Sequence, residues 1–116
     1  MMEIRKFDVT KKLSKVAVAG DLIFLSGVVA PEECKTAVEQ AKWELDAIEK
    51  ILEAHGSSRG RMLAATLYVK DVRCIPAVNE VWQNWFEGVE PPTRTCVEAK
   101  MASEYAQVEI TVTAAK

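Results

Sequence analysis

Apolar residues recur at spacings of three and four in the first half of the chain, which is the period of an amphipathic helix. Thr36 followed by Glu39 forms a capping-box pattern at the start of this stretch, and Gly56 is suited to end it. The pattern predicts a helix of about 18 residues. Its apolar positions are Val38, Ala41, Leu45, Ile48 and Leu52.

A second helix is predicted from about residue 73 to residue 87. Pro76 fits only in the first turn, where the missing N–H is not needed, and Pro91-Pro92 prevents any continuation. The apolar positions of this helix are Ile75, Val78, Trp82, Trp85 and Phe86.

Shorter apolar runs bounded by turn residues predict strands. Gly20-Asp21, between two such runs, predicts a hairpin. Near the end of the chain apolar and polar residues alternate, so that Val108 and Ile110 face one way and Glu109 the other. The predicted strands cover about residues 3–7, 14–19, 21–26, 63–70, 93–100 and 106–114.

The predicted order of elements is strands, helix, strand, helix, strand, strand, an α+β arrangement. Because two helices can cover only one face of such a sheet, the other face is left for solvent or for a neighbouring subunit. Its mixture of small, hydroxyl and charged residues favours a homo-oligomer interface, with an exposed antiparallel face as the alternative. The side chains assigned to this face are Lys15, Ala17, Thr66, Tyr68, Arg94, Cys96 and Glu109.

The composition, 49% hydrophobic and 28% charged, is that of a globular protein and excludes a disordered chain. With 116 residues and no repeat or linker, residues 1–116 are interpreted as one domain. The net charge of −2 and the lack of a long basic run disfavour nucleic acid as a partner. The longest apolar stretch, residues 22–30, is too short to span a membrane, so no membrane association is expected.

The three cysteines, Cys34, Cys74 and Cys96, are widely spaced, and the single histidine, His55, closes the first predicted helix. No zinc-type spacing links them, so we expect a reduced, cytoplasmic protein without a metal. A cysteine paired with His55 would be a candidate nucleophile. Ordinary thiols are the favoured interpretation, because none has a base at a recognisable spacing.

The Gly-Ser-Ser-Arg-Gly-Arg loop at residues 56–61 is a candidate phosphate-binding loop. It follows a helix and leads into a strand, which is the reverse of the order in a P-loop. A simple connector is therefore favoured.

A third candidate combines Arg94, Cys96 and Glu109. Arg94 and Cys96 share a strand face because they are two residues apart, and if their strand pairs with the last one as a hairpin, Glu109 joins them. An arginine suits bidentate binding of a substrate carboxylate, and a carboxylate beside it can position or deprotonate water. An Arg94–Glu109 ion pair within an interface is the alternative, and spacing alone favours it.

These residues lie in motifs that resemble the RidA (YjgF-type) family of reactive-intermediate deaminases over nearly the whole chain. The most specific is P-T-R-T-C-V-E at residues 92–98, followed by V-E-I at residues 108–110. The other matching segments, in order, are F-L-S-G (24–27), E-Q-A (39–41), Y-V-K-D (68–71) and V-N (78–79).

The resemblance implies a chorismate-mutase-like fold, with a six-stranded mixed sheet backed by two helices, assembled as a homotrimer with sites between subunits. It implies cofactor-independent hydrolysis of enamines and imines, such as 2-aminoacrylate, to 2-oxo acids and ammonia. By matching position, Arg94 would hold the substrate carboxylate and Glu109 would position water. Cys96 and Ser26 would line the pocket, and Asn79 would support the site from the second helix.

The chain departs from the better-known deaminases of this family at several points. Leu13 stands where an aromatic residue is usual, the loop after Gly27 is short, and Ala102-Ser103 replaces the usual Leu-Pro. These features resemble the short-loop, YoaB-like branch. A non-catalytic trimer that binds small carboxylic acids is therefore the alternative, and RNA cleavage or translation inhibition is less favoured because no basic–aromatic stripe is present.

Overall fold

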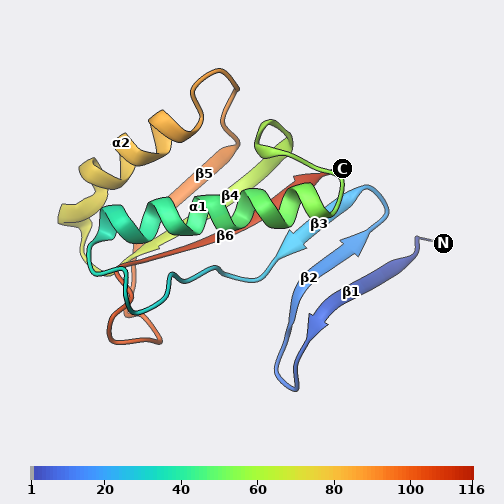
Figure 1. Cartoon of the computed structure of the whole chain (residues 1–116), viewed down its shortest axis with the longest axis horizontal. Coiled ribbons are helices and arrows are strands. Elements are labelled where there is room, and N and C mark those ends of the chain that lie inside the picture. The colour runs from blue at the N-terminus through green and yellow to red at the C-terminus, as the bar shows by residue number, and fades with distance from the viewer. Residues whose placement is uncertain (1) are drawn as a thin grey trace.

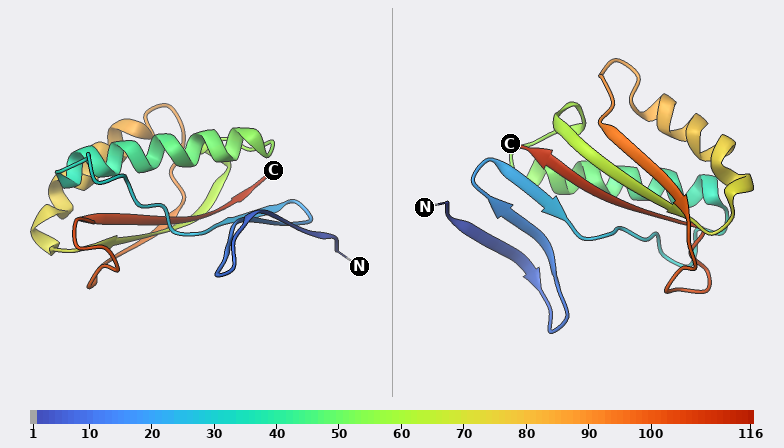
Figure 2. Two further views of the ribbon diagram at one scale, coloured as in Figure 1. Left: turned by 60° about the horizontal axis from the view of Figure 1, so that its bottom comes forward. Right: turned by 180° about the vertical axis from the view of Figure 1, so that it is seen from behind.

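The computed structural model describes residues 2–116 as a six-stranded sheet with two α-helices on one face (Figures 1 and 2), which confirms the expected α+β arrangement. Two short 3₁₀ turns precede β4 and α2. No helix in this part of the chain is long and apolar enough to cross a membrane. The elements are β1 (Ile4–Val9), β2 (Ser14–Ala19), β3 (Leu22–Leu25), α1 (Ala37–Ala54), β4 (Met62–Val69), α2 (Ile75–Trp85), β5 (Thr93–Glu98) and β6 (Val108–Ala115).

The helix boundaries follow from local chemistry. At the start of α1, the Glu39 N–H donates to Thr36 Oγ1 (3.1 Å) and the Thr36 N–H donates to Glu39 Oε1 (3.3 Å), so the predicted capping box is confirmed. Gly56, with φ +81°, follows the helix end. The helix α2 is shorter than predicted at both ends: Val72–Cys74 forms a 3₁₀ turn before it, and it ends at Trp85.

The strand order in the sheet is β1-β2-β3-β6-β4-β5, with every neighbouring pair antiparallel except β4 and β5. The last strand, β6, therefore lies between β3 and β4, and β4 separates it from β5. The hairpin considered between residues 93–100 and 106–114 is wrong. The connection between β5 and β6, residues 99–107, is longer than the two to five residues of a usual hairpin loop, and it passes over to the far side of β4.

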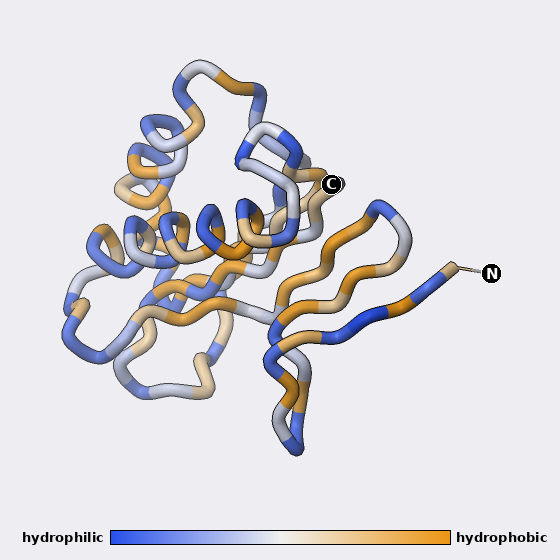
Figure 3. The backbone as a smooth tube through the Cα atoms, turned by 45° about the vertical axis from the view of Figure 1, so that its right-hand side comes forward, coloured by the Kyte–Doolittle hydropathy of each residue, from blue (hydrophilic) through white to orange (hydrophobic). Residues whose placement is uncertain are grey.

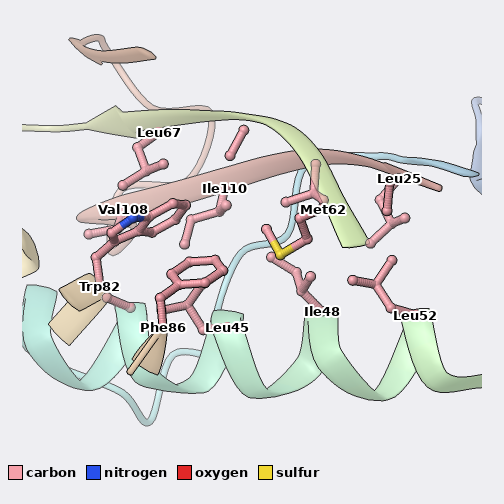
Figure 4. Packing of buried hydrophobic residues seen from close by; sticks show 14 of the residues in the cluster. Leu25, Leu45, Ile48, Leu52, Met62, Leu67, Trp82, Phe86, Val108 and Ile110 are labelled. Carbon is pink, nitrogen blue, oxygen red and sulfur yellow. The ribbon is translucent and has the colours of Figure 1, made fainter. Parts of the chain in front are cut away.

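The core lies between α1, α2 and the central strands. Leu45, Ile48 and Leu52 of α1 point toward the sheet, while Trp82 and Phe86 enter from α2 (Figure 4). Around α1, hydrophobic and hydrophilic residues alternate along the tube, as expected for a helix with one buried side (Figure 3). In β6, Val108, Ile110, Val112 and Ala114 are all buried, which confirms the predicted alternation.

The sheet face away from the helices, called the open face below, contains five of the seven residues assigned to it. These are Lys15, Ala17, Thr66, Tyr68 and Glu109, each alternating with a buried neighbour. The assignment of Arg94 and Cys96 to the open face is wrong. Parallel pairing aligns them with Ala65 and Leu67 of β4, which are buried beneath the helices.

Candidate functional site

Ser26 and Gly27 lie where the chain leaves β3. The Ser26 N–H donates to the Lys15 carbonyl (3.0 Å) and its hydroxyl donates to the Ser14 carbonyl (2.8 Å), which fixes Ser26 against β2. Two residues later the chain rejoins β6, since Val28 and Ile110 exchange backbone hydrogen bonds of 2.8 and 3.2 Å. Gly27 is thereby held between two anchored residues.

The Glu109 carboxylate lies directly against the Cα of Gly27. A Cβ at position 27 would overlap Glu109 Oε2 and lie 2.9 Å from its Cδ, so no larger residue fits without moving the carboxylate. Glu109 itself is half-buried on the open face. The role of Gly27 was missed from the sequence, because its backbone conformation is ordinary and only the neighbouring strand shows why a glycine is required.

Arg94 lies on the helix side of β5, at the edge of the sheet. Its guanidinium carbon is 5.3 Å from the ring centroid of the buried Trp82, a distance suited to a cation–π contact. Within residues 2–116 it forms no ion pair, and the side chain is exposed. The guanidinium is thus supported on one side and free to bind an anion.

Cys96 lies on β5 two residues after Arg94, and Asn79 lies on α2. Cys96 is half-buried and packs against the core on the same face of β5. The neighbouring Cys74 has a pKa raised by burial, with Cys96 adding to it, which makes this thiol a weaker nucleophile at neutral pH. Asn79 lies one turn before Trp82 on α2, and its buried Oδ1 accepts no hydrogen bond from the described residues.

The candidate residues therefore form two half-sites. One half-site consists of Ser26 and Glu109, with Gly27, and the other of Arg94 and Cys96, with Asn79 one turn from the Trp82 that supports Arg94. Arg94 and Glu109 point to opposite faces, and two strand spacings, about 10 Å, separate their strands. They form no ion pair within the described chain, so a site that uses both needs two copies of it.

A cleft of about 400 Å³ adjoins the first half-site, between α1 and the loop that joins β1 to β2. Its walls are mostly apolar, and Leu13 and Trp43 remain 47% and 43% exposed. Trp43 was missed from the sequence because it lies outside the apolar stripe of α1. The lining residues are Leu13, Lys15, Ser26, Gly27, Val28, Val29, Trp43, Ala47 and Ile51.

The other sequence candidates have structural partners. His55 packs against Phe7, with ring centroids 4.6 Å apart. Arg59, in the Gly-Ser-Ser-Arg-Gly-Arg loop, pairs with Glu49 at 2.6 Å and lies over the Trp85 ring. Residues 2–116 contain no group of three or more His, Cys, Asp or Glu side chains placed to hold a metal.

The sequence profile of the endoribonuclease L-PSP family matches residues 3–116. The chain belongs to this family. A solved member of the YjgF protein family from Neisseria meningitidis is 40% identical, with a TM-score of 0.93, and the match covers 99% of this chain and 96% of that one. The resemblance to the RidA (YjgF-type) family is thus confirmed.

Two named relatives in Escherichia coli bear on the branch and the chemistry. The RutC family protein YoaB is 30% identical over 98% of this chain and 99% of its own length. TdcF, provisionally named a reactive intermediate deaminase, is 28% identical over 78% of this chain and 76% of its own length. This L-PSP family chain therefore has a full-length relative in YoaB and a more distant one with a deaminase name.

Proposed function

We propose that this L-PSP family protein hydrolyses reactive enamines and imines of 2-amino acids to 2-oxo acids and ammonia. The observation that carries the proposal is the pair of half-sites: a carboxylate fixed against Gly27, and an unpaired arginine supported by Trp82. Water activation and carboxylate binding are the two tasks that this reaction requires. The deaminase name of TdcF supports the same reaction class.

The two half-sites meet when the open face of one subunit packs against the β5 edge of the next, in a homotrimer. Large apolar side chains on the open face support such packing. Ile4, Leu22 and Phe24 are 64%, 36% and 42% exposed, and strand pairing places them on one face. The three free thiols suit a reducing compartment such as the cytoplasm.

In the proposed reaction, Arg94 binds the carboxylate of a 2-imino acid and Glu109 of the adjoining subunit orients a water molecule. The water oxygen adds to the carbon of the protonated imine as Glu109 takes one of the water protons, giving a neutral carbinolamine. Glu109 then passes this proton to the nitrogen, and the C–N bond breaks as Glu109 takes the proton of the carbinol hydroxyl, so that ammonia leaves and the 2-oxo acid remains. Water is the only co-reactant, and an enamine enters the sequence after protonation at its β-carbon.

The apolar cleft beside Ser26 and Gly27 gives the substrate side chain a place to bind. Its walls from α1, including Trp43 and Ala47, carry no charge. A larger apolar side chain would bury more surface there than that of 2-iminopropanoate. We therefore expect preference for 2-imino acids with bulky apolar side chains, and Ala47→Trp should remove that preference.

The decisive experiment generates 2-aminoacrylate from serine with a dehydratase and measures release of the 2-oxo acid. Wild-type protein should accelerate release above the spontaneous rate, and so should the control variant Arg61→Ala, whose arginine lies outside both half-sites. No acceleration by folded wild-type protein would overturn the proposal. Binding of a 2-oxo acid without turnover would instead support a non-catalytic carboxylate-binding protein.

The trimer has its own test. Sedimentation equilibrium should give three times the chain mass of 12.9 kDa at micromolar concentration. Phe24→Asp should dissociate the assembly, whereas Val89→Asp, at a similarly exposed apolar residue outside the sheet, should not. A wild-type monomer would refute the proposed composite site, in which the two half-sites come from different subunits.

A further inference from the structure

Glu44 is a carboxyl group buried inside the protein. It lies on the sheet-facing side of α1, one turn from Gln40 and one turn from Ile48, and is 0% exposed. A carboxylate in such a position loses its hydration, which disfavours the charged form. A buried glutamate therefore needs an explanation beyond packing.

The hydrogen bonds of Glu44 are incomplete. Its Oε2 accepts the Ala30 N–H at 3.0 Å, while Oε1 is buried and has no partner among residues 2–116. Gln40 differs: its Nε2 donates to the carbonyls of Cys34 and Tyr105, both at 3.0 Å, and its Oε1 accepts the Gln107 N–H at 2.7 Å. Gln40 has the bonding of a structural residue, whereas Glu44 keeps one polar atom free.

The contact with Ala30 links Glu44 to the first half-site. The segment from Ser26 to Ala30 is fixed at Ser26 by β2, at Val28 by β6 and at Ala30 by Glu44. Gly27 lies within this segment and touches the Glu109 carboxylate. Glu44 therefore provides one of the three contacts that fix the segment carrying Gly27.

Glu44 and Glu109 also interact electrostatically. The pKa of Glu44 is raised from its ordinary 4.5 to about 9, chiefly by burial; the hydrogen bond from the Ala30 N–H opposes this rise and the negative charge of Glu109 adds to it. The side chains that β6 and α2 bury against α1 are apolar, and the covering residues 28–31 carry no charge. Glu109 is thus the charged group acting on Glu44, which is neutral at physiological pH.

We propose that Glu44 is a positioning residue for Glu109: its buried carboxyl group holds Ala30, one of the three points that fix the segment on which Gly27 meets the Glu109 carboxylate. The proposal rests on the proposed function only for its effect on turnover. The protonation state of Glu44 and its hydrogen bond with Ala30 depend on the fold alone and not on the proposed reaction.

The first test is independent of activity and compares thermal unfolding of wild type and Glu44→Gln across pH. The unfolded chain ionises Glu44 near 4.5 and the folded chain only near 9, so the unfolded state binds fewer protons between these values. Wild type should lose stability relative to Glu44→Gln as the pH rises from about 5 to 9, and the gap in Tm should then level off. Glu53→Gln, at an exposed position on α1, is the control with a constant gap. A constant gap for Glu44→Gln would overturn the assignment of a neutral acid.

The second test measures turnover. Glu44→Gln, which can still accept from the Ala30 N–H, should keep the wild-type kcat at pH 7. Glu44→Leu, which fills the space without an acceptor, should lower kcat about 10-fold or more at pH 7 with little change in KM. A fully active, folded Glu44→Leu variant would overturn the positioning role. If wild type itself shows no turnover, the proposed function fails while the Tm measurement still decides the state of Glu44.

Discussion

The two faces of the sheet are formed by the same strands but obey different constraints. On the helix-covered face, Val108 and Ile110 of β6 are 0% exposed, and each is held by the core that surrounds it. On the open face, the intervening Glu109 is held by a single glycine on the neighbouring segment. Packing therefore determines the residues of the covered face, whereas the open face retains polar groups that the core of the protomer does not require.

Arg94 is an exception to this distinction between the two faces. It belongs to the covered face by register, yet β5 is the edge strand and the side chain is exposed there. The edge of the covered face and the open face thus each supply one charged group of the proposed site, Arg94 and Glu109. The following substitutions test whether these groups act together, as the composite site requires.

The largest effect is expected for Glu109→Gln. The amide keeps the shape but cannot take a proton from water, so kcat should fall by about 10² to 10⁴, the range of a lost general base. The same assay, with 2-aminoacrylate generated from serine by a dehydratase, checks this, and Thr111→Ser is the control on the open face. Undiminished turnover would show that the open face carries no base.

Arg94→Ala should lower kcat/KM by a factor of about 10 to several hundred, because a charge-assisted hydrogen bond contributes roughly 1.5–3 kcal/mol. Arg94→Lys should stay well below wild type, since lysine restores the charge but not the planar fork. Turnover and trimer thermal stability are measured on the same preparation. A destabilised but fully active Arg94→Lys trimer would mean that Arg94 serves an ion pair between subunits instead.

Gly27→Ala should lower kcat by about 10- to 100-fold, because the new methyl group displaces the Glu109 carboxylate by roughly the ångström that costs such a factor. Stability should change little, as Gly27 is exposed and has an ordinary φ. The control is Gly60→Ala, where an added Cβ meets only Val89 at an ordinary 3.5 Å. Equal activity of the Gly27→Ala and Gly60→Ala variants would show that Gly27 does not position Glu109.

The smallest effect is expected for Cys96→Ser. Cys96 packs against the core beside Cys74 and has no role in the proposed proton transfers, so activity should stay within about threefold of wild type. A total loss of turnover in a folded variant would identify a catalytic thiol and invalidate the water mechanism.

The sequence predicted those parts of the fold in which local chemistry and periodicity agree. Thr36 and Glu39 mark the start of α1, and the alternation through Val108 and Ile110 assigns the faces of β6 correctly. The strand Thr93–Glu98 has no such alternation, since it lies at an edge and buries little, so its facing was assigned wrongly. The order of the strands in the sheet depends on long-range pairing, which the periodicity of the sequence does not predict.

The candidate site was predicted by residue type but not by arrangement. Motif resemblance singled out Arg94 and Glu109, yet their separation onto two faces depends on the parallel pairing of β4 with β5. Glu44 gave no signal, because a glutamate on a helix is usually solvated and only the fold shows that this one is enclosed. The roles of such residues depend on contacts between distant segments, so the pattern of neighbouring residues in the sequence does not predict them.

The central position of β6 has a consequence for how the protein is assembled during synthesis. This strand pairs with β3 on one side and β4 on the other, although it follows both in the chain. Until β6 has left the ribosome, the strand that joins β1–β3 to β4–β5 is missing, and β3 and β4 each lack the partner that β6 will provide. Folding is therefore completed late, by contacts between residues far apart in sequence, and the nascent chain exposes two strand edges open to mispairing until then.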